Sequence, residues 1–332
     1  MKKRAVVFLF AVTVLTALLC VSVGSVRVPL SDILALAADA LSGRAPTGAS
    51  RSIILDLRLP RVLCTALTGA CLSLSGAAMQ GLLKNPLADG STLGVASGAS
   101  LGAVISIAFG FNVFGGTAMT AVVFAFASLL LILALASGID SSLSTDTIIL
   151  IGVIFSMFVS GAMSVIVTVA PDRLRSITFW TMGSLSGCGY GDALLLLTAL
   201  LLCGGVLLSC SDGLNAFSIG EENARQIGVN VKAVRLKVLI CASALIGVSV
   251  SVAGCIGFVG LVTPHIVRLL VGANNKRLLP GSVFGGGIFL MLCDLAGRTV
   301  AAPREIPIGV ITSMIGAVIF IVIFCRSRRG RA

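Results

Sequence analysis

The feature that most constrains this chain is the length of its segments without any charged residue. No charged residue occurs between Asp89 and Asp140, and this interval is long enough for two membrane-spanning helices of about 20 residues each. A charged side chain at the centre of a bilayer costs about 2.5 to 3.5 kcal/mol, so charge-free windows mark the spans. Only 11% of the 332 residues are charged, against about a quarter in soluble domains. A water-soluble fold is therefore excluded.

The charge-free windows predict an all-α, polytopic membrane protein with about ten transmembrane helices. Ten spans of about 20 residues use about 200 residues, which leaves no room for a separate soluble catalytic domain. We expect a single transmembrane domain over residues 1–332, with an extracellular segment at 25–61, a cytoplasmic loop at 211–235 and a basic cytoplasmic tail at 326–332. The expected spans lie near residues 5–24, 62–82, 91–110, 117–136, 147–169, 193–210, 236–255, 257–271, 280–299 and 307–325.

Basic residues give the expected orientation. Lys2, Lys3 and Arg4 precede the first apolar run, so the positive-inside rule places both termini and all six lysines in the cytoplasm. The same run also fits a secretory signal peptide, but since everything downstream reads as membrane, we expect an uncleaved first span. Nine arginines fall outside instead, and the outer face is therefore expected to be basic. They are Arg27, Arg44, Arg51, Arg58, Arg61, Arg173, Arg175, Arg298 and Arg304.

Small residues in two spans give a weak internal repeat. The second and seventh expected spans run in opposite directions and carry the same residues at the same spacing. These residues are Gly69, Ser73 and Gly76 in one span and Gly247, Ser251 and Gly254 in the other. Inverted halves are common in transporters, whereas small residues also line helix contacts in any membrane bundle. Both interpretations stay open.

The chain lacks the usual motifs for nucleotide or metal chemistry. No GxxxxGK[ST] phosphate loop occurs, and the one histidine, His265, has no second imidazole with which to share a metal. His265 is expected to be a hydrogen-bonded structural residue instead of a ligand or proton relay. The ten cysteines form no CxxC pair and are predicted to be small packing residues. We therefore expect a transport subunit without catalytic residues.

The long cytoplasmic loop contains a short amphipathic helix at residues 218–228. Ser218 and Glu221 fit a capping box at its start, and Gly228 fits the usual helix stop. Glu221 and Arg225 are spaced to pair across one turn. A helix lying on the lipid surface is one interpretation. The adjacent acids Glu221 and Glu222 suit an anionic leaflet poorly, which favours a cytoplasmic protein partner.

An ordered series of motifs from about residue 50 onward resembles the FecCD family of ATP-binding-cassette (ABC) permeases, whose members import iron-siderophores, haem and vitamin B12. The motifs are Arg58-Leu-Pro-Arg61, Ser75-Gly-Ala-Ala-Met-Gln80, Asn85-Pro-Leu-Ala-Asp89, Leu93-Gly-Val, Trp180-Thr-Met-Gly-Ser-Leu-Ser186, the Gly220 to Gly228 insert, Gly257-Phe-Val-Gly-Leu-Val-Thr-Pro-His265 and Glu305-Ile-Pro-Ile-Gly309.

The resemblance implies a type II ABC importer in a bacterial cytoplasmic membrane. The expected cargo is a metal chelate, foremost a ferric siderophore, else haem or cobalamin. The implied partners are a second, identical or related permease, two ATPase subunits and an extracytoplasmic substrate-binding protein, besides membrane lipid and without nucleic acid. No cofactor would be bound permanently, since the ATPase chain uses the ATP and Mg.

The resemblance also assigns three sets of site residues. Arg58, Arg61 and Arg298 would present guanidinium groups to acidic patches of the binding protein. The cytoplasmic gate would comprise Asn85, Pro86, Leu87, Ser144 and Thr145. Coupling to the ATPase would use Ser218, Gly220, Glu221, Glu222, Ala224, Arg225 and Gly228.

Simpler interpretations stand beside each assignment. The outer arginines could anchor lipid phosphates, the gate segments could be plain turns, and Asp294, one turn before Arg298, could only fix that arginine's rotamer. Arg304 beside Glu305 departs from the family motif and either adds a docking contact or neutralises the acid. The alternative function is an ion-coupled secondary transporter without an ATPase. Its pathway would need buried ionisable groups, for which only Asp192, Asp294 and His265 are near candidates.

Overall fold

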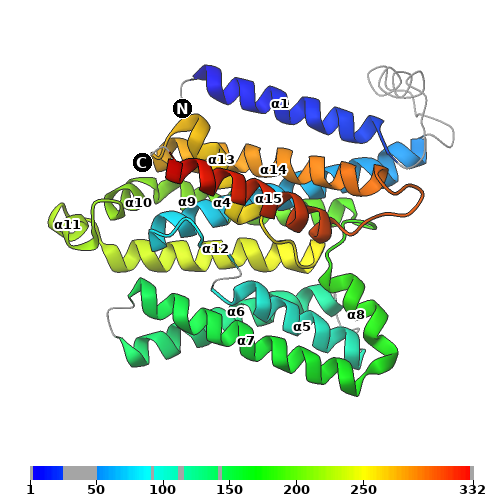
Figure 1. Cartoon of the computed structure of the whole chain (residues 1–332), viewed down its shortest axis with the longest axis horizontal. Helices are drawn as coiled ribbons and strands as arrows, with labels where there is room; N and C mark the ends of the chain where they lie inside the picture. Colours follow the sequence, from blue (N-terminus) through cyan, green and yellow to red (C-terminus); the bar gives the residue numbers. More distant parts are fainter. Residues whose placement is uncertain (1–2, 25–50, 91–92, 111–115, 141–143, 330–332) are drawn as a thin grey trace.

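The computed structural model describes residues 3–24, 51–90, 93–110, 116–140 and 144–329, and within these ranges the chain is helical without any strand (Figure 1). The apolar helices are α1 (Lys3–Ser22), α4 (Leu59–Leu83), α5 (Val95–Phe109), α6 (Gly116–Ile139), α7 (Thr145–Val169), α9 (Tyr190–Ser209), α12 (Val231–Ala253), α13 (Val259–Val271), α14 (Asn275–Thr299) and α15 (Ile308–Arg329). Shorter elements are a π-helical segment (Ser52–Arg58), a 3₁₀ turn (Pro171–Arg173), α8 (Leu174–Thr181), α10 (Ser211–Phe217) and α11 (Glu221–Gln226).

These ten apolar helices are consistent with the expected number of about ten spans and lie near the expected positions. Six of them are long and apolar enough to cross a membrane, and the apolar parts of α1, α5, α13 and α15 are shorter. The largest differences in bounds are at α12 and α14, which begin at Val231 and Asn275, five residues before their expected starts, and α14 carries Pro280 inside the helix. Helices α8 and α10 were not predicted. Most of the expected extracellular segment, residues 25–50, and residues 330–332 of the expected tail lie outside the described residues.

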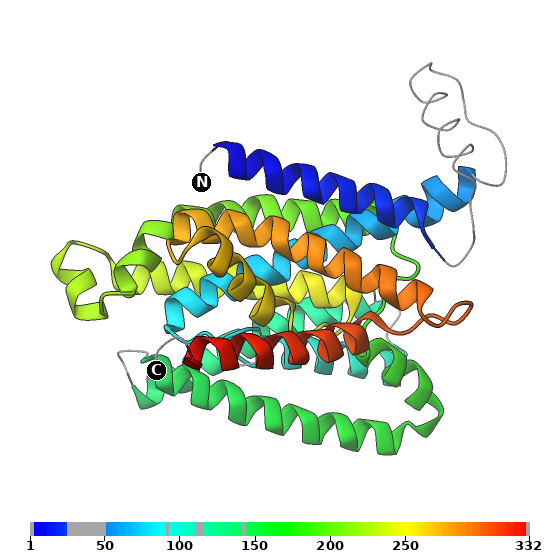
Figure 2. The same ribbon diagram turned by 45° about the horizontal axis from the view of Figure 1, so that its top comes forward.

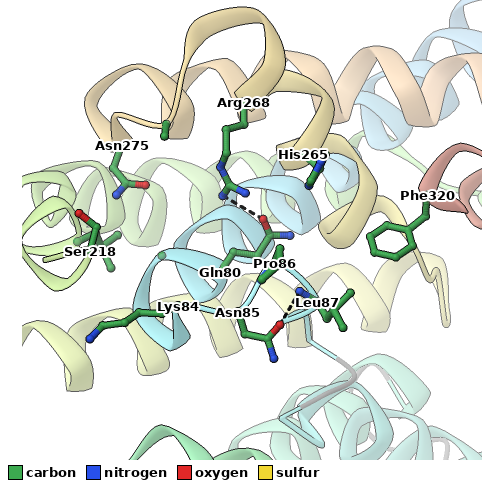
Figure 3. Close-up of a pocket in the computed structure, with 13 residues that line it drawn as sticks. Gln80, Lys84, Asn85, Pro86, Leu87, Ser218, His265, Arg268, Asn275 and Phe320 are labelled. Carbon is green, nitrogen blue, oxygen red and sulfur yellow. Dashed lines mark hydrogen bonds between the residues drawn. The ribbon is translucent and has the colours of Figure 1, made fainter. Parts of the chain in front are cut away.

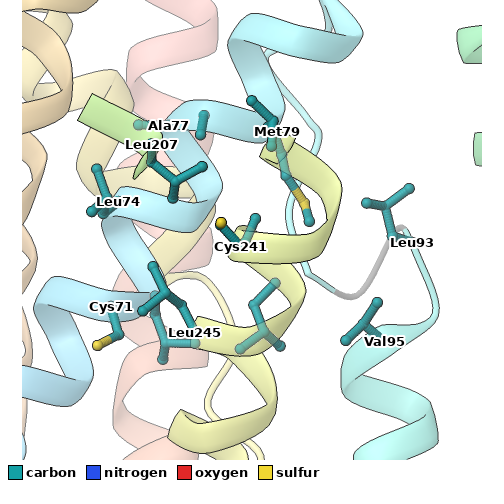
Figure 4. Packing of buried hydrophobic residues seen from close by; sticks show 14 of the residues in the cluster. Cys71, Leu74, Ala77, Met79, Leu93, Val95, Leu207, Cys241 and Leu245 are labelled. Carbon is teal, nitrogen blue, oxygen red and sulfur yellow. The ribbon is translucent and has the colours of Figure 1, made fainter. Parts of the chain in front are cut away.

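Helix α4 forms the centre of the bundle and packs most extensively against α14, with α12, α9 and α13 around it (Figure 2). Burial follows this arrangement: α4 and α12 are mostly buried, whereas α6, α7 and α9 turn most of their apolar surface outward, as expected in lipid. Figure 4 shows the packing at the centre, where Leu74 and Met79 of α4 meet Leu207 of α9 and Leu245 of α12. Cys241 packs in the same cluster, as predicted for the cysteines.

Glycines allow α4 to approach two neighbours very closely. A methyl group added at Gly69 would overlap the carbonyl oxygen of Gly286 in α14, and one at Gly286 would overlap the carbonyl oxygen of Gly69. A methyl group at Gly76 would overlap the backbone of Gly260 in α13. Small residues therefore line helix contacts, as one interpretation of the sequence held. The inverted repeat itself stays a prediction.

The chain between α12 and α13 leaves the helical conformation at residues 254–258. Helix α13 has 13 residues and is about 20 Å long, shorter than the roughly 30 Å hydrocarbon core. Its start lies deep in the bundle, because Gly260 packs against Leu72 and Gly76 in the middle of α4. Non-helical backbone at this depth must be buried in protein or line a water-filled cavity.

Candidate functional site

Three hollows follow helix α15 from one end of the bundle to the other. We name them outer, middle and inner after the orientation that the sequence predicts. The outer hollow, of about 530 Å³, is bordered by residues Glu305–Ile308, at the start of α15. The middle hollow, of about 460 Å³, reaches Gly309 to Met314 in the first turns of α15. The inner hollow, of about 670 Å³, reaches Phe320 near the other end. The bundle thus carries a track of cavities along its length.

The outer hollow contains the one ion-pair network found at this end in the described part of the chain. Arg61 Nη2 lies 2.9 Å from Asp294 Oδ1, and Arg61 Nη1 lies 2.9 Å from Glu305 Oε2. Asp294 Oδ2 lies 2.9 Å from Arg298 Nε, which confirms the expected pair across one turn of α14. Glu305 is therefore paired with Arg61, whereas neutralisation by its neighbour Arg304 was one of the two alternatives left open by the sequence.

Two of the three predicted docking arginines do not face solvent. The residues Arg58 and Arg298 are only 6% and 3% exposed. Arg58 donates hydrogen bonds to the carbonyl oxygens of Val21 (2.8 Å) and Ser22 (3.0 Å), and Arg298 donates to that of Cys20 (3.2 Å). Cations are favourable at the C-terminal end of a helix, where unpaired carbonyl groups concentrate negative potential. The expectation that these side chains are solvent-facing is therefore wrong, because they bind the end of α1.

The middle hollow is lined by the non-helical segment after α12 and has no charged residue among its described lining. Cys255 and Gly257 of that segment face Met182, and Ser313 and Met314 of α15 complete the wall. Cys255 Sγ lies 3.1 Å from Ser100 Oγ of α5. The cavity next to this segment meets the condition that membrane chemistry places on non-helical backbone.

The inner hollow lies beside the first predicted gate segment (Figure 3). Asn85 Oδ1 accepts a hydrogen bond from the Leu87 amide (2.9 Å), which forms an Asx turn with Pro86 at its centre. Lys84 ends α4 in a left-handed conformation at φ 49°. Asn85, Pro86 and Leu87 all line this hollow, so the structure places them at the inner end of the track.

The second predicted gate segment begins α7. Ser144 precedes the helix, its amide donates to Asp140 Oδ2 (3.2 Å), and its hydroxyl lies 2.8 Å from the Thr147 hydroxyl. Thr145 is the first helical residue. Neither Ser144 nor Thr145 lines the inner hollow, so in the described residues the two gate segments do not form one site. Residues 141–143, which precede this segment, lie outside the described residues.

The predicted ATPase-coupling residues, 218–228, are called the coupling segment. They include the short helix α11, but the contacts at its start differ from the predicted ones. The N-cap of α11 is Gly220, at φ 112°, and no side chain caps the helix. The Ser218 hydroxyl instead donates to the Asn215 carbonyl (2.6 Å), so the predicted capping box is wrong. Glu221 pairs with Arg235 of α12 and not with Arg225. Gly228, at φ 86°, ends the helix as predicted.

The coupling segment is tied to the rest of the inner end. Ala224 is fully buried, so it holds α11 in place and offers no surface to a partner, whereas Ile219 and Ile227 are 57% and 64% exposed. Asn215, at the end of α10, accepts hydrogen bonds from the backbone and side chain of Asn275 in α14 (2.8 and 3.1 Å).

Two further polar residues at the inner hollow were not assigned by the sequence analysis. Arg268 of α13 donates a hydrogen bond to Gln80 Oε1 of α4 (3.2 Å). Gln80 was noted only as part of a family motif, and Arg268 was overlooked because it lies at the end of an apolar helix. A cation within an apolar segment is itself a signal for function.

Comparison with known proteins gives a consistent assignment. The model of the FecCD transport family matches residues 12–326. The uncharacterized ABC transporter permease protein YvrB of Bacillus subtilis (strain 168) is 45% identical over 84% of this chain and 80% of its own length. The molybdate import system permease protein MolB of Haemophilus influenzae is 35% identical over 96% and 94%. The hemin transport system permease protein HmuU of Yersinia pestis is 37% identical over 84% and 85%.

A solved structure supports the same assignment. An inward-facing putative metal-chelate type ABC transporter superposes with a TM-score of 0.87 at 32% identity, covering 97% of this chain and 99% of the other. These relatives confirm the architecture expected from the sequence. They give no support to the alternative of an ion-coupled secondary transporter.

Proposed function

The chain belongs to the FecCD transport family, and from this premise we propose that it is the permease subunit of an ATP-driven importer that moves a metal chelate across a bacterial cytoplasmic membrane. The observation that carries this proposal is the track of three hollows along α15. A track through a bundle of apolar helices provides a route for a solute that is too polar to cross lipid. Its middle part has no described charged residue, so a bulky chelate would meet few fixed charges there.

The names of the relatives limit the chemical class of the cargo. MolB is named for molybdate and HmuU for hemin, and the solved structure is described as a metal-chelate type transporter. We therefore place the cargo in the class of metal complexes. A ferric siderophore remains the favoured member, with haem and cobalamin as alternatives.

A second permease would complete the track. Helices α7 and α15 lie on one side of the bundle (Figure 2) and expose large apolar side chains, among them Met157, Phe158, Met314 and Val318. An identical or related chain placed against this side would enclose the hollows between two subunits.

The ATPase would act on the track through the coupling segment. Helix α11 follows α10, and Leu214 and Ser218 at the end of α10 line the inner hollow. A push on α11 would therefore reach the gate segment at Asn85 through directly packed residues. The ATP and Mg would be used in the partner chain.

The first prediction concerns the energy source. Purified permease in liposomes is expected to take up no chelate with ATP until the ATPase subunit is added, because the chain has no phosphate-binding loop. The measurement compares uptake of a labelled ferric siderophore, haem or cobalamin by liposomes with the permease alone and by liposomes with the permease and the ATPase. Uptake by the permease alone, driven by a proton or sodium gradient, would contradict the proposal.

The second prediction concerns the surface that the ATPase would contact. Replacing both Ile219 and Ile227 with aspartate is expected to prevent co-purification of the ATPase, because exposed apolar anchors dominate the stability of interfaces. The permease itself should fold normally, since both side chains are exposed. Lys232→Asp, at an exposed position on the nearby start of α12, is the matched control and should still bind the ATPase. Normal assembly of the double variant would favour the interpretation of α11 as a helix on the lipid surface.

Docking of a substrate-binding protein remains part of the proposal, with a revised set of contacts. Arg61 and Glu305 border the outer hollow, and Arg304, Arg173 and Arg175 are exposed at the same end. These residues can meet a partner directly. Arg58 and Arg298 would contribute only if the end of α1 moved away from them.

A further inference from the structure

The inner hollow has an electrostatic character that transport by itself does not explain. Its lining includes Lys84, His265 and Arg268, and none of its described lining residues is acidic. The hollow is therefore a cavity of about 670 Å³ with a net positive charge.

The guanidinium of Arg268 is held in a fixed position. Gln80 is buried, and its Nε2 donates to the carbonyl oxygens of Gly260 (3.3 Å) and Leu261 (3.2 Å). Because both amide hydrogens are used, the Gln80 Oε1 atom is left to accept the hydrogen bond from Arg268 Nη2 (3.2 Å). A guanidinium has five N–H donors, so this contact orients the group and leaves donors for a ligand.

Arg268 faces the hollow and not the lipid. Leu269 and Leu270, the next two residues of α13, are exposed on the outside of the bundle, whereas Figure 3 shows Arg268 pointing toward Gln80. Basic side chains inside membrane helices are rare and usually face a partner or a water-filled cavity. The position of Arg268 therefore indicates a polar occupant.

Two further residues that can carry positive charge line the same hollow. His265 lies one turn before Arg268, on the same side of α13, and its buried Nδ1 atom has no hydrogen-bond partner among the described residues. Lys84, at the end of α4, also lines the hollow, and its exposed side chain extends away from Arg268 and His265 in Figure 3. A planar guanidinium and an ammonium around one cavity suit carboxylate or tetrahedral oxyanion groups, which accept several charge-assisted hydrogen bonds.

We propose that the inner hollow binds an anionic oxygen group, a carboxylate or an oxyanion, of the solute as it leaves the permease on the cytoplasmic side. This inference rests on the proposed function, because it takes the track along α15 as the route of the solute. It narrows the cargo to complexes that carry such a group. The hollow lies beside Asn85 and Leu87, so a bound anion would contact the gate segment directly.

The test uses the full-length permease in nanodiscs of phosphatidylcholine, with citrate and molybdate as probes in calorimetric titrations. Wild-type protein is expected to bind at least one probe saturably, and added salt should weaken binding. Arg268→Gln and Lys84→Asn should each weaken it by about tenfold or more, as expected for losing a charge-assisted hydrogen bond. Lys84 is exposed, so its replacement is a test that does not depend on the folding of a buried site.

Arg277→Gln is the matched control. Arg277 is an exposed arginine near the start of α14, so this variant removes the same charge outside the hollow and should bind like wild type. Unchanged binding in both the Arg268 and Lys84 variants, or no binding of either probe, would overturn the proposal.

Nanodiscs of phosphatidylglycerol separate a solute from a lipid headgroup. If phosphatidylglycerol co-purifies with wild type, is lost in Arg268→Gln and no solute binds, the occupant is lipid and the proposal is wrong. The binding assay needs no ATPase, so its result can be distinguished from a failure of ATP-driven transport. A permease that carries chelates with its ATPase but binds no anion would refute this inference alone.

Discussion

A single added methyl group at Gly286 is expected to prevent the bundle from reaching its native packing. The new Cβ of Gly286→Ala would overlap the carbonyl oxygen of Gly69 and crowd the side chain of Ser73. The obstacle is backbone in the middle of α4, which cannot move aside as a flexible side chain would. Overpacking costs about 1 to 3 kcal/mol where side chains can adjust, and we expect a loss of at least about 3 kcal/mol at this contact.

The matched control is Gly205→Ala in α9. Gly205 also lies inside a helix, but a Cβ added there meets nothing within 4 Å. Alanine is favoured over glycine in a helix, so this variant should be neutral or more stable by about 0.4 to 1 kcal/mol. Thermal unfolding of the detergent-purified proteins measures both changes. A Gly286→Ala protein that melts like wild type would show that α4 and α14 lie farther apart than the structure places them.

The sequence was sufficient to predict the spans because the membrane penalises charge so strongly. The interval between Asp89 and Asp140 predicted two helices, and α5 and α6 occupy it. Ten helices follow from the same rule applied along the chain. The absence of charge says little about how deep in the bundle a segment lies. It therefore did not show that residues 254–258 leave the helical conformation inside the bundle.

The short helices show where local signals failed. The start of α11 satisfied a capping pattern at Ser218, but the helix begins one turn later, at Glu221, after Gly220. Glu221 pairs with Arg235, which is far along the chain and could not be selected from spacing alone. Pairing within a helix is worth only about 0.2 to 0.5 kcal/mol, so a tertiary partner easily overrides it.

The sequence placed Arg58 and Arg298 at the correct end of the bundle, but it predicted that their side chains are exposed to solvent, whereas they are buried. Sequence placed Arg58 and Arg298 near helix ends, and such positions usually face water. It could not show that the end of α1 packs over them and supplies carbonyl acceptors. Burial of a cation depends on a chain segment distant in sequence, which no local pattern encodes.

Replacing Asp294 with alanine is expected to be the most damaging change to any charged residue in the structure. Asp294 is 2% exposed and lies between Arg61 and Arg298. Removing the carboxylate leaves two guanidinium groups close together without their shared counter-charge. Breaking a buried ion pair from one side typically costs about 3 to 5 kcal/mol. The unfolding temperature of the purified permease should fall sharply.

Two further variants separate charge from packing. Asp212→Ala removes an acid paired with Lys276 on the exposed surface, and this change should cost about 1 kcal/mol or less. Adding Arg61→Met and Arg298→Met to Asp294→Ala should recover part of the lost stability, because apolar side chains often replace a buried ionic cluster well. If the triple variant is no more stable than Asp294→Ala, unpaired charge is not the source of the damage.

The same network predicts where the damage appears first. Arg298 reaches the Cys20 and Val23 carbonyl oxygens at the end of α1 (3.2 and 3.4 Å) and holds Asp294 on its other side. Loss of Asp294 should therefore loosen α1 before the rest of the bundle, since α1 packs mainly against α14. Hydrogen exchange should rise in residues 18–23 of Asp294→Ala, while α4 stays protected. Uniform exchange across both helices would instead mean that Asp294 supports the whole bundle and not the attachment of α1.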